Sequence, residues 1–250
     1  MEHQKVAKIK AVISDFIGTL VNAHYYDIEA SRRILHRFLY DSGLETNWSE
    51  FLKAYVHAHE KYRMVRYEQM REVTNAVWIC EALGNLGFAL NPDDSRIKVA
   101  LEAFFKNYLD SLELRPFARR LVQRIRQSCK LGLVSNFTYA PLIFASLRKL
   151  NISQYFNTVV VSHECGWRKP HKQIFQEILR KLEVNTEEAV LIGDSPLEDI
   201  KGAQSAGLKT VFVTSQFYKP KDINASGLKP NYVAKSLEDV YINLSNIICE

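Results

Sequence analysis

The chain has 250 residues, of which 47% are hydrophobic and 24% charged, and its ten glycines and seven prolines are too few for a disordered or low-complexity protein. Its formal net charge of +5 at pH 7 is mild for this length, so neither nucleic acid nor a membrane surface is expected as a partner. No stretch approaches the roughly 18 unbroken apolar residues of a membrane span. The first residues carry no secretory signal, so a cytoplasmic location is predicted.

The first part of the chain combines one short apolar run with a long helical stretch. Residues 8–15 predict a buried strand that ends on Asp15, and Gly18 follows as a turn signal. Between residues 24 and 112 no run predicts a strand, and apolar side chains recur at helical spacing. This spacing predicts four helices, which begin near His24, Asn47, Thr74 and Asn91.

From Arg115 onward, predicted helices and strands alternate. The strands are short apolar runs at residues 131–135, 158–162, 189–194, 210–213 and 231–234. Such alternation predicts an α/β protein with a parallel sheet covered on both faces, and with functional residues at the carboxyl ends of the strands. The strand at residues 8–15 needs this sheet for pairing. We therefore expect a core of residues 1–21 and 114–250 and an inserted helical domain of residues 22–113.

Four polar motifs stand near the ends of predicted strands. They are Asp15, Ser135-Asn136, Lys169-Pro170 and Gly193-Asp194, the last followed by Glu198 and Asp199. A single carboxylate at a strand end is usually a cap or a turn former. The carboxyl ends of parallel strands, however, meet at one edge of a sheet. The four motifs together therefore predict one site.

In this order and spacing, the motifs resemble those of the haloacid dehalogenase-like hydrolase superfamily over the whole length of the chain. The resemblance extends through the stretch from Ser162 to Phe175 and the stretch from Gly193 to Gly207. It implies a Rossmann-like core in which the helical insert is an all-helical cap domain. It also implies a hydrolase, in the first place a Mg²⁺-dependent phosphatase that acts on a small phosphorylated metabolite.

The resemblance implies a role for each motif. Asp15 would be the nucleophile that forms an aspartyl-phosphate, and Lys169 would supply a cation beside it. Asp15 and Asp194 would hold Mg²⁺ together with the backbone carbonyl of Ile17, and Asp199 would be an outer or water-mediated ligand. The residues expected to hold the phosphoryl oxygens or to support the nucleophile turn are Ser135, Asn136 and Thr19.

One position departs from the family's phosphatases, which usually carry a second aspartate two residues after the nucleophile. Here that position is Ile17, which cannot transfer a proton, and a general acid or base typically contributes about 10²–10⁴-fold. A non-catalytic protein that binds a phosphorylated ligand or a protein is therefore an alternative. A dehalogenase or phosphonatase is a third hypothesis. Asp194 and Asp199 count against the dehalogenase, and no cap lysine stands in a recognisable context for the phosphonatase.

Other polar residues leave alternatives open. His24 follows the first motif closely enough to replace the missing acid, although surface or capping histidines are commoner. Arg63, Arg66 and Arg71 interrupt a tyrosine-rich helix, where they either contact an anionic substrate or form a solvated face. The basic run that begins at Arg115 is interpreted as a polar helix face turned to water.

Overall fold

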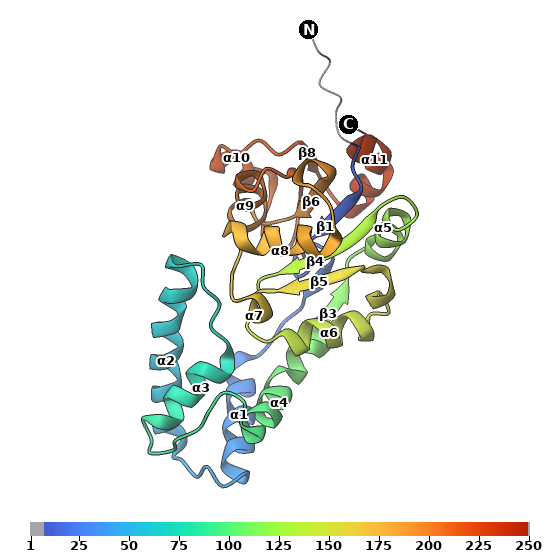
Figure 1. Ribbon diagram of the computed structural model, residues 1–250. Helices are drawn as coiled ribbons and strands as arrows, with labels where there is room; N and C mark the ends of the chain where they lie inside the picture. The colour runs from blue at the N-terminus through green and yellow to red at the C-terminus, as the bar shows by residue number, and fades with distance from the viewer. Residues whose placement is uncertain (1–7, 250) are drawn as a thin grey trace.

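The computed structural model describes residues 8–249 and contains a six-stranded sheet whose strands all run parallel (Figure 1). In the order in which they pair, the strands are β5 (Thr158–Val161), β4 (Lys130–Ser135), β1 (Ala11–Ser14), β6 (Ala189–Gly193), β7 (Lys209–Val213) and β8 (Tyr232–Ala234). Because β1 pairs with both β4 and β6, the strand that precedes Asp15 lies inside the sheet. The predicted α/β fold with a parallel sheet is confirmed.

Helices cover both faces of the sheet. Successive strand residues point to opposite faces, so the apolar side chains of a strand need covering on both sides. On β1, Val12 belongs to one buried apolar cluster and Ile13 to the other. The first cluster includes α5 (Ala118–Ile125), α6 (Ala140–Lys149) and α11 (Leu237–Cys249), and the second includes α8 (Lys172–Leu182) and α9 (Gly202–Ser205). The shorter helices are α7 (Ser162–Cys165), α10 (Pro220–Ser226) and the 3₁₀ turns Ser153–Tyr155 and Thr186–Glu188.

Four helices lie between two short antiparallel strands, β2 (Val21–Ala23) and β3 (Leu112–Leu114). They are α1 (Ile28–Asp41), α2 (Trp48–Glu68), α3 (Asn75–Gly84) and α4 (Ser95–Ser111), and we call them the helical segment. Asn47 caps α2 as predicted, since its side-chain oxygen accepts hydrogen bonds from the backbone N–H groups of Ser49 and Glu50. Figure 1 shows the helical segment at one end of the sheet.

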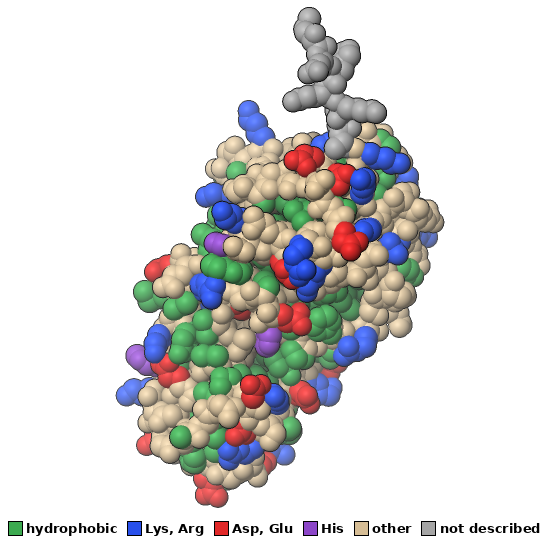
Figure 2. Space-filling view, viewed as in Figure 1, with side chains coloured by type: hydrophobic (Ala, Val, Ile, Leu, Met, Phe, Trp, Pro, Cys, Tyr) green, Lys and Arg blue, Asp and Glu red, His purple; other side chains and the backbone are tan. Residues whose placement is uncertain are grey.

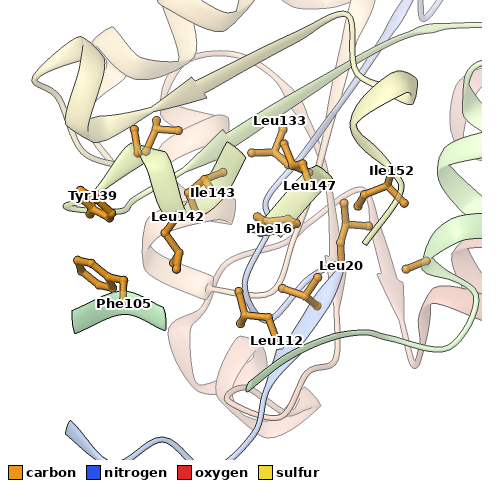
Figure 3. Packing of buried hydrophobic residues seen from close by; sticks show 14 of the residues in the cluster. Phe16, Leu20, Phe105, Leu112, Leu133, Tyr139, Leu142, Ile143, Leu147 and Ile152 are labelled. Carbon is orange, nitrogen blue, oxygen red and sulfur yellow. The ribbon is translucent and has the colours of Figure 1, made fainter. Parts of the chain in front are cut away.

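A continuous apolar cluster joins the helical segment to the sheet region. Phe105 on α4 stacks on Tyr139, which precedes α6, with ring centroids 4.7 Å apart and the rings nearly parallel (Figure 3). On the face shown in Figure 2, side chains of both charges are interspersed over the two regions, with hydrophobic side chains between them. The paired strands β2 and β3 contain the positions near residues 21 and 114 at which the sequence suggests the domain boundaries. The division into a core and an inserted cap domain stays a prediction.

The elements differ from the predicted ones in several places: the first helix begins at Ile28 rather than near His24, and the short helices α7 and α10 were not predicted. The fourth helix begins at Ser95 rather than at Pro92, because the Asp94 carboxylate accepts the backbone N–H of Arg96 and caps the helix there. The helix predicted after β6 begins with a π-helical stretch, Pro196–Lys201. The strands β2 and β3 are too short to give a periodic pattern and were not predicted.

Among residues 8–249, no helix combines the length and the apolar character needed to cross a membrane. The prediction that the chain begins without a secretory signal falls mainly on residues 1–7, which lie outside the described residues.

Candidate active site

The predicted functional residues gather at the carboxyl edge of the sheet, because neighbouring parallel strands end there together. Asp15 follows β1 directly, Ser135 is the last residue of β4, and Asp194 follows β6. Since β1 lies between β4 and β6, these three positions are neighbours in space although they are far apart in the chain.

Lys169 reaches this edge from the loop before α8 and joins two carboxylates. Its Nζ donates to Asp15 Oδ1 at 2.7 Å and to Asp199 Oδ1 at 2.6 Å, and all three residues are buried. Asn136 fixes the lysine backbone from both sides: its Oδ1 accepts the Lys169 N–H at 2.7 Å, and its Nδ2 donates to the Lys169 carbonyl at 2.9 Å. The ammonium therefore has a fixed position beside Asp15.

Asp199 lies in the π-helical stretch after β6 and has partners on both oxygens. Its Oδ2 accepts the backbone N–H groups of Asp194 at 3.1 Å and Ser195 at 2.9 Å, while Oδ1 faces Lys169. The carboxylate fits closely against the strand end, because a Cβ at Gly193 would lie 2.5 Å from Asp199 Cβ. With both oxygens engaged, Asp199 orients Lys169 and the turn, which suits an outer role at a metal.

Asp194 is oriented by two hydroxyl groups. Thr19 Oγ1 donates to Asp194 Oδ1 at 3.3 Å, and Ser215 Oγ donates to Asp194 Oδ2 at 2.6 Å. The turn after β1 approaches this carboxylate so closely that a Cβ at Gly18 would lie 2.4 Å from Asp194 Oδ2. Gly18 also has a φ of +99°, which L side chains rarely adopt. Only glycine allows this approach.

The cluster holds more negative than positive charge. Asp15, Asp194 and Asp199 each place an oxygen within 4.8 Å of the others, and among residues 8–249 the only ion pairs they form are with Lys169. Burial, together with the nearby Asp15 carboxylate, raises the pKa of Asp194 to about 7. Burial opposes the charged form of Lys169, but the Asp15 and Asp199 carboxylates outweigh it and raise the lysine pKa.

The composition of this cluster fits a magnesium ion. Three carboxylates against one ammonium leave two negative charges, which a divalent cation would balance. Mg²⁺ prefers oxygen ligands. The buried Asp15 Oδ2 has no hydrogen-bond partner among the described residues, so it is an oxygen in need of a proton or a cation. The carboxylates that could hold the ion are those of Asp15, Asp194 and Asp199, and the division into direct and outer ligands stays a prediction.

The remaining predicted residues lie at the same edge. Ser135 is buried at the end of β4, and the Thr19 hydroxyl is directed to Asp194, so Thr19 supports that carboxylate. The half-buried Ile17 side chain packs against the apolar cluster and offers no proton. The use of Ser135, Asn136 and Thr19 for phosphoryl binding, and of the Ile17 carbonyl for a metal, stays a prediction.

Two residues at the sheet edge were not identified as site residues by the sequence analysis. Ser215, which orients Asp194, follows β7 by two positions, so attention to every strand end would have included it. Arg115 donates to the carbonyls of Gly18 at 2.6 Å, Thr19 at 3.0 Å and Thr214 at 2.5 Å. It thereby ties the turn after β1 to the loop after β7. The interpretation of the basic run as a face turned to water is wrong for this half-buried arginine.

A buried ion pair connects the loop after α2 with the loop that carries Lys169. Arg168 Nη1 donates to Glu72 Oε2 at 2.6 Å, and Ser162 Oγ donates to the same oxygen. The backbone adds two links, since the Arg168 N–H donates to the Met70 carbonyl at 2.9 Å and the Glu72 N–H to the Gly166 carbonyl at 3.0 Å. No sequence pattern indicated these contacts.

His24 and the three arginines of α2 and the following loop, for which the sequence left alternatives open, differ in their burial and in their partners. His24 forms a 2.7 Å pair with Glu113 and is largely exposed, so the structure does not bring it to Asp15. Arg63 is exposed, and Arg71 is exposed with its guanidinium over the ring of a neighbouring tryptophan. Arg66, in contrast, is buried.

Comparison with known sequences relates the chain to one family and to phosphatases. The family model described as haloacid dehalogenase-like hydrolase matches residues 12–213. The chain is 31% identical over 214 residues to a glyceraldehyde 3-phosphate phosphatase of Methanopyrus kandleri, a match that covers 84% of this chain and 86% of that protein. It is 32% identical over 111 residues to a ribulose-1,5-bisphosphate 5-phosphatase of Halopiger xanaduensis, which covers 44% of this chain and 46% of that protein.

Comparison with solved structures supports the fold. A 2-haloacid dehalogenase from Pseudomonas syringae superposes with a TM-score of 0.65 at 19% identity, over 96% of this chain and 99% of that one. At this level of identity the similarity shows a shared fold and leaves the activity open.

Proposed function

The chain belongs to the haloacid dehalogenase-like hydrolases, and we propose that it is a phosphatase that acts on a small phosphorylated metabolite through a covalent intermediate on Asp15. One observation carries this proposal: the buried Asp15 carboxylate has one oxygen on Lys169 and the other without a partner among residues 8–249. A carboxylate in this arrangement is fixed in place and keeps one oxygen available to a reacting group.

The proposed reaction has two displacements at phosphorus. Asp15 attacks the phosphoryl group while the bond to the leaving oxygen breaks, which gives an aspartyl-phosphate. Water then attacks the same phosphorus, the bond to Asp15 breaks, and inorganic phosphate leaves. Lys169 holds Asp15 in place through its hydrogen bond and offsets the charge of the phosphoryl oxygens. A magnesium ion held by Asp15, Asp194 and the Ile17 carbonyl would supply further positive charge beside those oxygens.

Ile17 sets which leaving groups depart readily. Without a general acid at this position, the leaving oxygen departs according to its own basicity, so aryl and acyl phosphates react faster than alkyl phosphates. The second displacement also lacks a base, so the aspartyl-phosphate persists. The names of the relatives support phosphorylated sugars of few carbons as the substrate class. Ile17 then predicts slow turnover of such alkyl esters.

The decisive experiment combines steady-state and burst kinetics. With Mg²⁺, p-nitrophenyl phosphate should be hydrolysed with an initial burst, and both burst and turnover should vanish with EDTA or in Asp15→Asn. Sugar phosphates should follow at a lower rate. Metal-independent activity, or full activity in Asp15→Asn, would overturn the proposal.

The non-catalytic alternative rests on Ile17 alone. If neither the native protein nor Ile17→Asp hydrolyses any phosphate ester, while inorganic phosphate still binds in calorimetry, a phospho-ligand-binding protein is the better assignment. Phosphonoacetaldehyde and 2-chloropropionate test the third hypothesis in the same assay.

We also propose a cytoplasmic location, because all four cysteines are free thiols, as is typical of reducing compartments.

A further inference from the structure

Glu72 lies in the loop after α2, at the contact between the helical segment and the sheet region, and its side chain has no exposed surface. Both of its carboxylate oxygens have partners. Oε1 accepts the Val73 N–H at 3.1 Å, and Oε2 accepts from Arg168 Nη1 at 2.6 Å and from Ser162 Oγ. A buried carboxylate is costly unless such partners hold it, so the side chain of Glu72 has a fixed place.

The first of these partners, Arg168, directly precedes Lys169 in the chain. The backbone reinforces the ion pair, because the Arg168 N–H donates to the Met70 carbonyl at 2.9 Å and the Glu72 N–H donates to the Gly166 carbonyl at 3.0 Å. The loop after α2 therefore runs along the backbone that leads into Lys169 and holds it from the side of the helical segment.

The second partner, Ser162, leads to the other segment that holds Lys169. Ser162 Oγ donates to Glu72 and accepts the Phe137 N–H at 2.9 Å. Phe137 directly follows Asn136, whose side chain binds both the N–H and the carbonyl of Lys169. Glu72 thus closes a ring of contacts through the loop after β4 and the loop before α8.

Glu72 is the principal counter-ion of Arg168 among residues 8–249. The other carboxylate within ion-pair distance is that of Glu198, whose Oε1 lies 3.9 Å from Arg168 Nη2 and whose side chain is 31% exposed. Without the charge of Glu72, the buried guanidinium would move toward Glu198 or toward water. Because Arg168 and Lys169 are adjacent, such a movement shifts the backbone of Lys169.

A shift of Lys169 reaches the proposed reaction centre directly. Its Nζ donates to Asp15 at 2.7 Å and to Asp199 at 2.6 Å. The turn at Ser135 and Asn136, where we expect the phosphoryl oxygens, is joined to Lys169 by the Asn136 side chain. A displacement of about 1 Å at a reaction centre can cost about 10²-fold in rate, even when its cause lies outside the centre.

We propose that Glu72 is a positioning residue, which holds Lys169 and the turn after β4 in the arrangement that phosphoryl transfer needs without touching the substrate. The inference rests on the proposed function. It gives the loop after α2 a part in the reaction that is separate from any contact with the substrate, because this loop completes the support of two loops of the sheet region.

Hydrogen exchange, followed by mass spectrometry, tests the arrangement without turnover. In Glu72→Gln, the segments that contain the amides of Phe137 and Lys169 should exchange faster than in the native protein, because both loops lose a common support. The segment that contains β1 should keep its native exchange rate, since it is held inside the sheet on both sides.

Kinetics and binding test the consequence for the reaction centre. With Mg²⁺ and saturating p-nitrophenyl phosphate, the rate constant of the burst should fall by about 10- to 100-fold in Glu72→Gln. The affinity for tungstate, an anion with the shape and charge of phosphate, should fall as well in calorimetry. Glu72→Asp, which keeps the charge, should restore part of both losses. Ser162→Ala, which keeps the ion pair, should show a smaller loss than Glu72→Gln.

Leu35→Ala is the matched control for lost stability. Leu35 is fully buried in α1 and has no place in the ring of contacts, so its truncation destabilises the helical segment by leaving a cavity. At a temperature well below unfolding, this variant should keep the native burst rate constant, the native tungstate affinity and the native exchange of the two loops.

Native exchange of both loops in Glu72→Gln would overturn the inference. Faster exchange with an unchanged burst and unchanged tungstate affinity would also overturn it, because Glu72 would then be a structural link only. Equal losses in Leu35→Ala would do the same. Failure of the proposed function shows separately, as absence of a Mg²⁺-dependent burst in the native protein, and the tungstate affinities then decide whether Glu72 positions the site.

Discussion

The sheet edge and the end of α2 differ in how their buried charges are partnered. At the sheet edge, three buried carboxylates meet one ammonium, and the cluster carries two unmatched negative charges. At the end of α2, Arg66 is buried with no carboxylate beside it among the described residues. The first arrangement suits a divalent cation, whereas the Arg66 guanidinium lies 5.0 Å from the centroid of the Trp78 ring and donates to His59. The carboxylates of the sheet edge therefore lack a partner that the buried arginine already has within the helical segment. Changes at the two places should therefore have different signatures.

The largest expected effect is the loss of all turnover in Asp194→Asn. This substitution removes the charge of one of the carboxylates proposed to hold the metal, so hydrolysis of every phosphate ester should fall by about 10⁴-fold or more. The rise in unfolding temperature that Mg²⁺ gives to the native protein should disappear as well. Ser215→Ala is the milder companion, because it removes only the hydroxyl that orients Asp194, and it should lose about 10- to 100-fold.

A gain of activity should follow from Ile17→Asp. The new carboxyl group can protonate the leaving oxygen and then activate water, which is worth about 10²–10⁴-fold for poor leaving groups. Alkyl phosphates should gain by up to this factor, while aryl phosphates, whose leaving groups need no proton, should change little. The ratio of the two rates is the measurement. If the native protein already hydrolyses alkyl phosphates as fast as aryl phosphates and without a burst, another group supplies the proton and the gain should be absent.

Glu72→Gln tests how firmly the two regions are joined. The substitution leaves the Arg168 charge buried without its carboxylate partner, which typically costs about 3–5 kcal/mol of unfolding free energy. Denaturant unfolding should show this loss, and Glu72→Gln combined with Arg168→Met should recover part of it. Lys61→Ala, which removes an exposed pair with Glu81 at 2.8 Å, is the control and should change the stability by less than about 1 kcal/mol. A stability loss no larger than in this control would contradict a tight connection.

The smallest expected effect is a pH dependence of the metal response. In the folded protein without metal, the pKa of Asp194 is raised to about 7. In the unfolded chain, the pKa of an aspartate lies near 4. The stability that the proton on Asp194 contributes is present below about pH 4 and is lost as the pH rises through 7. Since Mg²⁺ binds the ionised form, the rise in unfolding temperature on adding Mg²⁺ should be larger at pH 8 than at pH 5.5. Asp194→Asn, which should have lost the response to Mg²⁺, should show no rise at either pH.

Sequence reasoning reached the parts of the site that lie directly at strand ends. The amino-acid pattern alone places Asp15, Ser135 and Asp194 together, because apolar runs identify buried strands and the ends of parallel strands meet. The α/β fold and the position of the helical insert followed from the same periodicity. Lys169 was included among the motifs near strand ends, but its place beside Asp15 came from the resemblance, since the length of its loop does not say where its side chain reaches.

What the sequence by itself determined about this protein is therefore the order of its strands and helices and the polar residues that end the strands. The tertiary structure alone decided which charges are buried and which are paired. Arg63 and Arg66 are three residues apart on one helix and look equivalent in the sequence, yet one is exposed and the other is buried with its guanidinium over the Trp78 ring. Arg115 likewise looked like a surface residue and instead holds two loops at the sheet edge. The physical reason is that local periodicity reports the face on which a residue lies, whereas burial and pairing depend on segments that are distant in the chain.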